Sequence, residues 1–293
     1  MKRAIIFGAN GQDGFYLSKI LQKKKYQVIM TSRSGNKSHK LNVANYLAVK
    51  KIIENEQPQL IFNFAATSST SHKFLFDNLN TIVKGTVNIL EACRSLNSSA
   101  KIFIAGSGLQ FLNLNKMIKV TDNLDFKSAY VCARNSALFY TRYYRSLGLN
   151  VYYGFLFNHE SSRRPRNHLT WRLFRDSKKY AKNRIQAITI INEKTKKEWA
   201  HAEDVCNEIY RFVSKGKASD AIIGTGEGLE IKDYISLLIK SFSSPENSES
   251  IKFNREKHAK LDYKKLISSP SQFKTINNIP KIILDLKKNA CKR

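Results

Sequence analysis

The segment from residue 8 to residue 14 constrains the fold of this chain more than any other. It reads Gly8-Ala9-Asn10-Gly11-Gln12-Asp13-Gly14, so that glycine recurs at the spacing GxxGxxG. An apolar run over residues 3–7 precedes it, and an amphipathic pattern over residues 14–24 follows it. Glycines between a strand and a helix let the backbone turn tightly and approach a pyrophosphate, whose charge the helix N-terminus meets. The segment therefore predicts a dinucleotide-binding site at the start of a Rossmann-type fold.

Strand and helix patterns alternate through the first half of the chain. The strand-like runs cover residues 3–7, 27–31, 59–64, 101–105 and 151–157, and the helical patterns cover residues 14–24, 43–55, 79–96 and 130–147. Strands separated by helices imply a parallel sheet that is covered on both faces. We therefore predict an α/β fold, namely a Rossmann-type doubly wound parallel sheet with a smaller C-terminal substrate-binding lobe.

The pattern changes after residue 158, where a basic loop over residues 163–167 begins a stretch of shorter elements. We predict two domains on this basis. A cofactor-binding Rossmann domain would cover residues 1–160, and a smaller mixed α/β substrate lobe would cover residues 161–293. The chain would cross between the two lobes near residues 185–205.

Positive charge is the most unusual feature of the composition. The 293 residues include 50 Lys and Arg against 23 Asp and Glu, a formal net charge of +27. This charge alone would favour a nucleic-acid partner, but the basic residues form short clusters along the whole chain, with no basic tail and no recognisable nucleic-acid module. We therefore predict no nucleic-acid partner, and a field that attracts a nucleoside diphosphate and a phosphorylated cofactor.

The sequence offers no membrane or metal signal. The apolar run near the N-terminus ends at Gly8, and no stretch approaches the roughly 20 apolar residues of a membrane span. We predict a cytoplasmic protein without a membrane partner. The six histidines show no metal-ligand spacing, and no CxxC pair occurs. The four cysteines are predicted to be reduced thiols without a metal: Cys93, Cys132, Cys206 and Cys291.

The end of the second predicted strand indicates which dinucleotide is bound. An NAD-specific fold would place Asp or Glu here, and this chain has Thr31-Ser32-Arg33-Ser34 instead. An arginine flanked by hydroxyls can bind a 2′-phosphate through charge-assisted hydrogen bonds, whereas an acid would repel it. The segment predicts NADP as the cofactor, and the alternative is an arginine that is merely exposed after a strand.

Three separated motifs occur in an order that resembles the GDP-mannose 4,6-dehydratase family of the extended short-chain dehydrogenase/reductase superfamily. They are Gly11-Gln12-Asp13-Gly14, then Asn158-His159-Glu160-Ser161 with Arg163-Arg164, and then Trp199-Ala200-His201-Ala202-Glu203-Asp204. The similarity runs from residue 1 to about residue 235. The resemblance implies a lyase that binds NADP and a nucleotide sugar close to GDP-mannose, assembled as a homodimer or homotetramer.

The resemblance also implies a set of binding residues. The cofactor would contact Gly8, Asn10, Gly11, Gln12, Asp13, Gly14, Arg33, Ser34, Asn42, Val43, Phe64, Ala65, Ala66, Thr67, Ser68, His159 and Arg164. The substrate would contact Asn158, Glu160 and Arg163. Asn42 stands where the family usually has Asp, a change that can keep a hydrogen bond to adenine. An alternative for the His159 loop is that it only joins the two lobes.

Catalysis in the superfamily needs a tyrosine acid/base, a cation on the next helical turn, and a Ser or Thr that holds the sugar oxygen. The candidates are Tyr130, Arg134 and Ser107. Tyr130 and Arg134 are four residues apart in a helical pattern and so share a face. Arg134 replaces the usual lysine, and it keeps the positive charge but cannot lose a proton.

Leu109 is the second departure from the family pattern. The family carries a glutamate two residues after the catalytic Ser or Thr, and Leu109 occupies that position. The glutamate would remove the C5 proton, and losing a positioned base typically costs about 10²- to 10⁴-fold in rate. Three hypotheses therefore stay open. They are an NADP-dependent 4,6-dehydratase in which another residue supplies the base, an NADP-dependent 4-keto-sugar nucleotide reductase, and a catalytically degenerate nucleotide-binding homologue.

Overall fold

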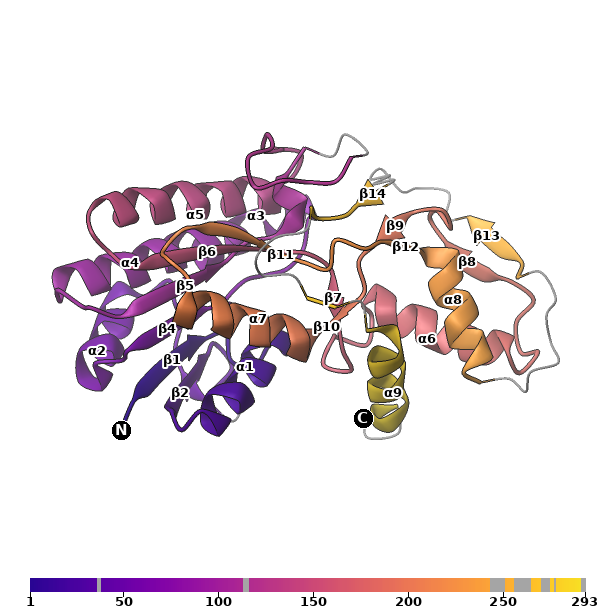
Figure 1. Cartoon of the computed structure of the whole chain (residues 1–293), viewed down its shortest axis with the longest axis horizontal. Coiled ribbons are helices and arrows are strands. Elements are labelled where there is room, and N and C mark those ends of the chain that lie inside the picture. Colours follow the sequence, from indigo (N-terminus) through magenta and orange to yellow (C-terminus); the bar gives the residue numbers. More distant parts are fainter. Residues whose placement is uncertain are drawn as a thin grey trace.

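The computed structural model describes residues 1–35, 38–112, 116–242, 251–255, 265–269, 275–276 and 278–290. Figure 1 shows a large α/β lobe that contains the N-terminus and a smaller lobe formed mostly by later segments. Within the described residues, no helix is both long and apolar enough to cross a bilayer.

A seven-stranded sheet forms the centre of the large lobe. Its order is β11-β6-β5-β4-β1-β2-β3, and every neighbouring pair is parallel. The strands are β1 (Arg3–Phe7), β2 (Gln27–Ser32), β3 (His39–Lys40), β4 (Leu60–Asn63), β5 (Lys101–Ala105), β6 (Val151–Leu156) and β11 (Asp220–Ile223). The first six strands follow the Rossmann order 3-2-1-4-5-6, whose direction reverses between β1 and β4. Ligands of such sheets bind at the carboxyl ends of the strands at this reversal.

Helices cover both faces of the sheet, as predicted. The helices α2 (Tyr46–Glu56), α4 (Gly85–Ser95) and α5 (Ala129–Ser146) lie on one face, and α1 (Gln12–Lys23) and α7 (Ala202–Lys215) lie on the other. The side chains of β1 alternate between the two cores, because successive side chains of a strand point to opposite faces. Ile5 and Phe7 pack in the first core, and Ala4 and Ile6 pack in the second.

The smaller lobe is built around its own apolar core. Its elements are α6 (Leu169–Tyr180), α8 (Ile231–Lys240), α9 (Ile279–Asn289), β8 (Ile188–Ile190), β9 (Lys196–Lys197), β12 (Leu229–Glu230), β13 (Phe253–Arg255) and β14 (Lys265–Leu266). Trp199 and Tyr234 stack in this core with ring centroids 3.7 Å apart. The short strands β7 (His159–Glu160) and β10 (Ala200–His201) pair in parallel where the two lobes meet.

The domain division is more complex than a single boundary at residues 160 and 161. The chain leaves the large sheet after β6, forms α6, β8 and β9, and then returns as α7 and β11. Residues 202–223 therefore belong with the first sheet, although the predicted substrate lobe included them. The return follows from the burial of one face of α7, whose Val205, Ile209 and Phe212 pack in the core of the large lobe.

The predicted element bounds differ from the structure mainly at helix ends. The second helix begins at Tyr46 and not at residue 43, because the Asn45 side chain accepts a hydrogen bond from the Ala48 backbone N–H at 3.1 Å and caps the helix there. The pattern over residues 79–96 is not one regular α-helix. It divides into the π-helical turns of η2 (Leu79–Lys84) and the helix α4, after the short helix α3 (Leu75–Asn78).

Candidate active site

The glycine loop forms a tight cradle at the carboxyl end of β1. Gly8 has a φ of +81°, and a Cβ atom there would lie 2.7 Å from the Ala65 nitrogen. A Cβ atom on Gly14 would lie 2.6 Å from the Cα atom of Ala9. Because neither position has room for a side chain, glycine is required for the strand, the turn and α1 to approach this closely. This cradle fits the pyrophosphate of the dinucleotide that the glycine spacing, together with its place between a strand and a helix, predicts.

A cavity of about 290 Å³ opens beside the cradle, at the ends of β1, β2 and β4. Ten of the predicted cofactor residues line it: Gly8, Asn10, Gly11, Arg33, Ser34, Asn42, Val43, Phe64, Ala65 and Ala66. The sequence prediction missed Ser32, Leu41 and Thr81, which also line it. Ser32 was within reach of prediction, because it sits in the same hydroxyl-rich segment as Ser34. Leu41 and Thr81 carry no sequence signal of their own.

Arg33 lies at the rim of this cavity with neighbouring hydroxyl groups. Its side chain is 66% exposed, and its Nη1 atom lies 3.6 Å from a carboxylate oxygen of Asp77. The Asn10 amide donates hydrogen bonds to the hydroxyls of Ser32 and Ser34 at 2.7 and 2.9 Å. The Asn42 side-chain oxygen accepts from the Ala44 N–H at 3.0 Å. The Arg33 side chain is thus largely exposed, with Asp77 as its partner and the hydroxyls of Ser32 and Ser34 beside it in the sequence.

A second cavity of about 190 Å³ lies where β5, α5 and the segment after β6 meet. Ser107, Tyr130 and Arg134 all line it, as do the predicted residues Asp13, Phe64, Ser68, Asn158, His159 and Arg164. Phe64 lines both cavities. Other lining residues that were not predicted are Thr70, Ala105, Gly106, Gly108, Leu156 and Phe157. The two cavities therefore form neighbouring parts of one site.

Tyr130 and Arg134 are in direct contact on the buried face of α5. The Arg134 Nε–H donates to the Tyr130 hydroxyl at 3.2 Å, and a second guanidinium nitrogen donates to the backbone oxygen of Ala105. The exposed fractions of Tyr130 and Arg134 are 7% and 6%. The bond to the end of β5 fixes the guanidinium, so that its charge faces the phenol oxygen in a dry environment, where electrostatic effects are strong.

Ser107 begins a short 3₁₀ turn, η3 (Gly108–Gln110), after β5 ends. The Ser107 hydroxyl accepts from the Leu109 N–H at 3.2 Å, and the Gln110 side chain accepts from the Ser107 N–H at 2.9 Å. This turn places Leu109 in the wall of the catalytic cavity. Gln110 is fully buried, and it also accepts from the Tyr153 hydroxyl at 2.9 Å. Gln110 is thus structural and faces away from the cavity.

Asp13 and His159 form a buried pair at the base of the site. The His159 Nε2 atom lies 2.9 Å from a carboxylate oxygen of Asp13, and Nδ1 lies 2.7 Å from the backbone oxygen of Phe157. Burial opposes ionisation of Asp13, but the charge and hydrogen bond of His159 outweigh it and hold the pKa of this carboxyl at about 2. Burial likewise opposes charging of His159, but Asp13 raises the pKa of the imidazole above its ordinary value. Both ring nitrogens face acceptors, which suits a doubly protonated imidazolium.

Gln12 joins the glycine loop to the segment after β6. The Ser161 hydroxyl donates to the Gln12 side-chain oxygen at 2.7 Å, and the Gln12 amide donates to the His159 backbone oxygen at 3.3 Å. Gln12 is therefore placed as a support for the loop. Gly14 and Thr67, two other predicted cofactor residues, also do not line either cavity.

The three predicted substrate residues lie in different environments. Asn158 lines the catalytic cavity, and its amide nitrogen is buried without a hydrogen-bond partner in the part of the chain that the structure describes. Glu160 is buried beneath the loop, where it accepts from Arg164 Nε at 3.2 Å and from the Thr170 hydroxyl at 2.6 Å. Arg163 lines a separate cavity on the outer side of α1. Only Asn158 is thus brought to the catalytic cavity.

The fold and the site define a Rossmann-type enzyme of the short-chain dehydrogenase/reductase superfamily. The profile of the family described as GDP-mannose 4,6 dehydratase matches residues 5–289, and the chain belongs to this family. The chain is 27% identical to the GDP-mannose 4,6 dehydratase of Drosophila melanogaster in an alignment that covers 82% of this chain and 68% of that protein. It is 28% identical to the GDP-mannose 4,6-dehydratase of Yersinia enterocolitica in an alignment that covers 82% of this chain and 72% of that protein.

Solved structures confirm the predicted fold class. The UDP-glucose 4-epimerase of Thermotoga maritima with UDP-glucose has a TM-score of 0.83 at 16% identity, covering 98% of this chain and 99% of that one. The structure of RMD from Pseudomonas aeruginosa complexed with NADPH has a TM-score of 0.82 at 14% identity, covering 100% of both chains. The dTDP-glucose 4,6-dehydratase of Bacillus anthracis in complex with NAD has a TM-score of 0.79 at 16% identity, covering 99% and 97%. At these identities the likeness concerns the fold.

Proposed function

We propose that this chain is an NADP-dependent, 4,6-dehydratase-like enzyme that acts on GDP-mannose or a close relative. The reaction would comprise oxidation at C4, loss of water, and return of hydride to C6. The observation that carries the proposal is the meeting of Ser107, Tyr130 and Arg134 in one cavity with Asn158, next to the glycine cradle. The family membership and the relatives' substrates support the choice of a GDP-linked sugar.

Each polar residue of the catalytic cavity would have a separate role in the oxidation at C4 of the sugar. The bound dinucleotide would supply a hydride acceptor and donor. Tyr130 would take the proton of the C4 hydroxyl as the carbonyl forms, and Ser107 would hold the same oxygen by a hydrogen bond. The Arg134 guanidinium, 3.2 Å from the Tyr130 oxygen, would stabilise the phenolate. Asn158 would use its buried amide nitrogen to orient the sugar.

The rim around Arg33 supports NADP over NAD. The end of β2 carries Arg33 between two serines, and none of the described residues that line the adjoining cavity is a carboxylate. A 2′-phosphate would bind the guanidinium and the adjacent hydroxyls through charge-assisted hydrogen bonds. The Asp77 carboxylate, 3.6 Å from Arg33, would yield that guanidinium to the phosphate, because the ion pair is largely exposed and therefore weak.

Leu109 favours a second candidate, an NADPH-dependent reductase of a nucleotide-linked 4-keto sugar. Among the described residues that line the catalytic cavity, the only carboxylate is Asp13, and His159 already holds it. Elimination needs a base at C5, whereas ketone reduction needs only hydride at C4 and a proton from Tyr130. Ser107, Tyr130 and Arg134 suffice for that reaction.

One set of incubations separates the candidates. Purified protein with NADP and GDP-mannose is followed by mass for loss of one water, alongside Tyr130→Phe and Leu109→Glu. Product from the wild type that disappears in Tyr130→Phe supports the dehydratase. Product from Leu109→Glu alone means that elimination has been lost. In that case the wild type is assayed with NADPH and a GDP-linked 4-keto-6-deoxy sugar, and consumption of NADPH supports the reductase. Tight NADPH binding without either turnover identifies a degenerate homologue.

A further inference from the structure

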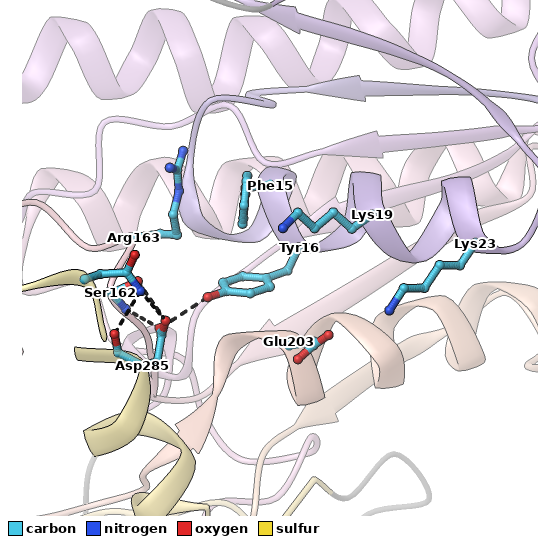
Figure 2. Close-up of a pocket in the computed structure, with 9 residues that line it drawn as sticks. Phe15, Tyr16, Lys19, Lys23, Ser162, Arg163, Glu203 and Asp285 are labelled. Carbon is cyan, nitrogen blue, oxygen red and sulfur yellow. Dashed lines mark hydrogen bonds between the residues drawn. The ribbon is translucent and has the colours of Figure 1, made fainter. Parts of the chain in front are cut away.

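The largest of the three cavities lies outside the site described above. It has a volume of about 520 Å³, against about 290 and 190 Å³ for the two parts of the candidate active site. Figure 2 shows it between the outer face of α1, the segment at Ser162 and Arg163, the start of α7, and α9. Its lining residues are Phe15, Tyr16, Lys19, Lys23, Ser162, Arg163, Glu203, Asp285 and Asn289. None of them lines either part of the candidate active site.

Positive charges stand along one side of this cavity. Lys19 and Lys23 are one helical turn apart on α1, and among the described residues no carboxylate lies within ion-pair distance of either ammonium. At longer range the Lys23 charge helps to lower the pKa of Glu203. The Arg163 guanidinium lies 4.2 Å from the centre of the Phe15 ring, and the Lys19 ammonium lies 4.3 Å from the same centre. The Phe15 ring therefore holds two of the cations in place at the cavity wall.

The two carboxylates of the cavity are already engaged. Asp285 accepts hydrogen bonds from the backbone N–H and the hydroxyl of Ser162 at 2.7 and 3.0 Å, and from the Tyr16 hydroxyl at 3.3 Å. Glu203 pairs with Lys281 at 3.0 Å. Figure 2 shows Asp285 turned toward Ser162 and Tyr16. Both carboxylates thus have donors of the protein itself as partners, and the three cations that line the cavity outnumber them.

We propose that this cavity binds a small organic molecule that carries a diphosphate group, with Lys19, Lys23 and Arg163 contacting the phosphates. Residues four apart rise by about 6 Å along a helix, a spacing that matches two adjoining phosphates better than one. Lysine and arginine form their strongest hydrogen bonds with such anions. A volume of about 520 Å³ falls within the range of about 300–1,000 Å³ that is typical of small-molecule sites, and it leaves room for an organic body.

Two segments of the chain connect the proposed site to the candidate active site. Arg163 lies two residues after Ser161, whose hydroxyl donates to Gln12. Lys19 and Lys23 belong to the helix that begins with Gln12 and Asp13. A ligand here would therefore contact the outer side of two segments whose inner sides line the candidate active site. The proposal itself does not rest on the proposed function.

The test is a calorimetric titration of the full chain with ADP after saturation with NADPH, which fills the cofactor cradle. The variant removes both lysines (Lys19→Ala with Lys23→Ala). The matched control removes two charges just beyond the same helix (Lys24→Ala with Lys25→Ala), and these residues do not line the cavity. We expect the wild type and the control to bind ADP alike, and the Lys19/Lys23 variant to bind it about tenfold more weakly or worse. Unchanged melting temperatures confirm that both variants fold.

Three results would overturn the proposal. One is the absence of ADP binding to the NADPH-saturated wild type. Another is an equal loss of affinity in both double variants, which would mean attraction by diffuse charge. The third comes from a parallel titration with inorganic pyrophosphate. We expect pyrophosphate to bind more weakly than ADP because it leaves most of the cavity unfilled, and equal affinity would exclude an organic ligand. Separate measurement of NADPH binding and of turnover shows whether the proposed function fails independently.

Discussion

The cofactor side and the substrate side of the candidate site differ in how they are built. On the cofactor side, ten predicted residues line one cavity, and all come from the carboxyl ends of neighbouring strands and the turns that follow them. On the substrate side, the residues of one short motif lie in three different places. Asn158 lines the catalytic cavity, Glu160 is buried beneath the loop, and Arg163 lies on the outer side of α1. Backbone geometry builds the first region, whereas side-chain partners from distant elements build the second.

The largest effect should come from the catalytic cavity that joins the two regions. Replacing Tyr130 with Phe removes the acid/base and should lower kcat by about 10²- to 10⁴-fold. The hydroxyl lies 3.2 Å from Arg134, and the ring contacts do not depend on it, so we expect NADPH affinity to be unchanged. Steady-state rates and fluorescence titration of NADPH measure the two quantities. Retention of full activity would exclude Tyr130 from the chemistry.

His159 tests whether the segment after β6 depends on a buried ion pair. Replacing His159 with Gln removes the positive charge beside the partly buried Asp13 carboxylate, which should lower the free energy of unfolding by about 1–3 kcal/mol. Chemical denaturation measures this loss. A Ser161→Ala variant is the control with a smaller loss, because it removes the neutral hydrogen bonds of the hydroxyl to Gln12 and to the Arg163 backbone N–H and leaves the Asp13–His159 pair in place.

The same pair sets a pH dependence whose sign follows from the raised pKa of His159. A group whose pKa is higher in the folded state stabilises the fold fully below its unfolded value of 6.5 and loses this contribution as pH rises through its folded value. The stability gap between the wild type and His159→Gln should therefore be largest below pH 6.5 and narrow above it. Melting temperatures of both proteins across this pH range measure the gap. If His159 were neutral in the folded protein, the gap would not narrow as pH rises. Asp13, with a pKa of about 2, keeps its charge throughout this window.

Replacement of Arg33 tests the cofactor side of the site. Replacing Arg33 with Ala should weaken NADPH binding by about tenfold or more, the usual worth of a hydrogen bond to a charged group, and leave NADH binding unchanged. Fluorescence titration with NADPH and with NADH gives the change in affinity for each cofactor. Replacing Asp77 with Asn is the control, because it frees the guanidinium from its partner at 3.6 Å. Equal losses for NADPH and NADH would mean that Arg33 does not contact a 2′-phosphate.

The glycine cradle offers a test of backbone geometry alone, whose effect should fall on stability and not on a single catalytic contact. Gly8→Ala adds one methyl group at a φ of +81°, against backbone atoms 2.7 Å away, and should destabilise the fold by about 1–3 kcal/mol. Gly148→Ala is the control, because Gly148 also has a positive φ of +95° but has open space around it. Denaturation midpoints compare the two. An equal loss in both variants would attribute the cost to φ alone and not to the close approach.

The sequence by itself determined the sheet, the glycine cradle and the shared face of Tyr130 and Arg134. These features depend on strand and helix periodicity and on positions that admit only glycine, and both are local properties of the chain. Arg33 and Ser34 line the cavity beside the cradle because they follow β2, and the end of a strand has one place in a parallel sheet.

Only the tertiary structure decided the rest. The 3₁₀ turn at Ser107 turns Leu109 toward the cavity and buries Gln110 against Tyr153, a partner 43 residues away. Glu160 lies beneath the loop because Thr170 and Arg164 satisfy its carboxylate there. Arg163 faces the outer cavity because Phe15 on α1 offers its ring on that side. These orientations follow from contacts between segments that are distant in sequence, and no local pattern records them.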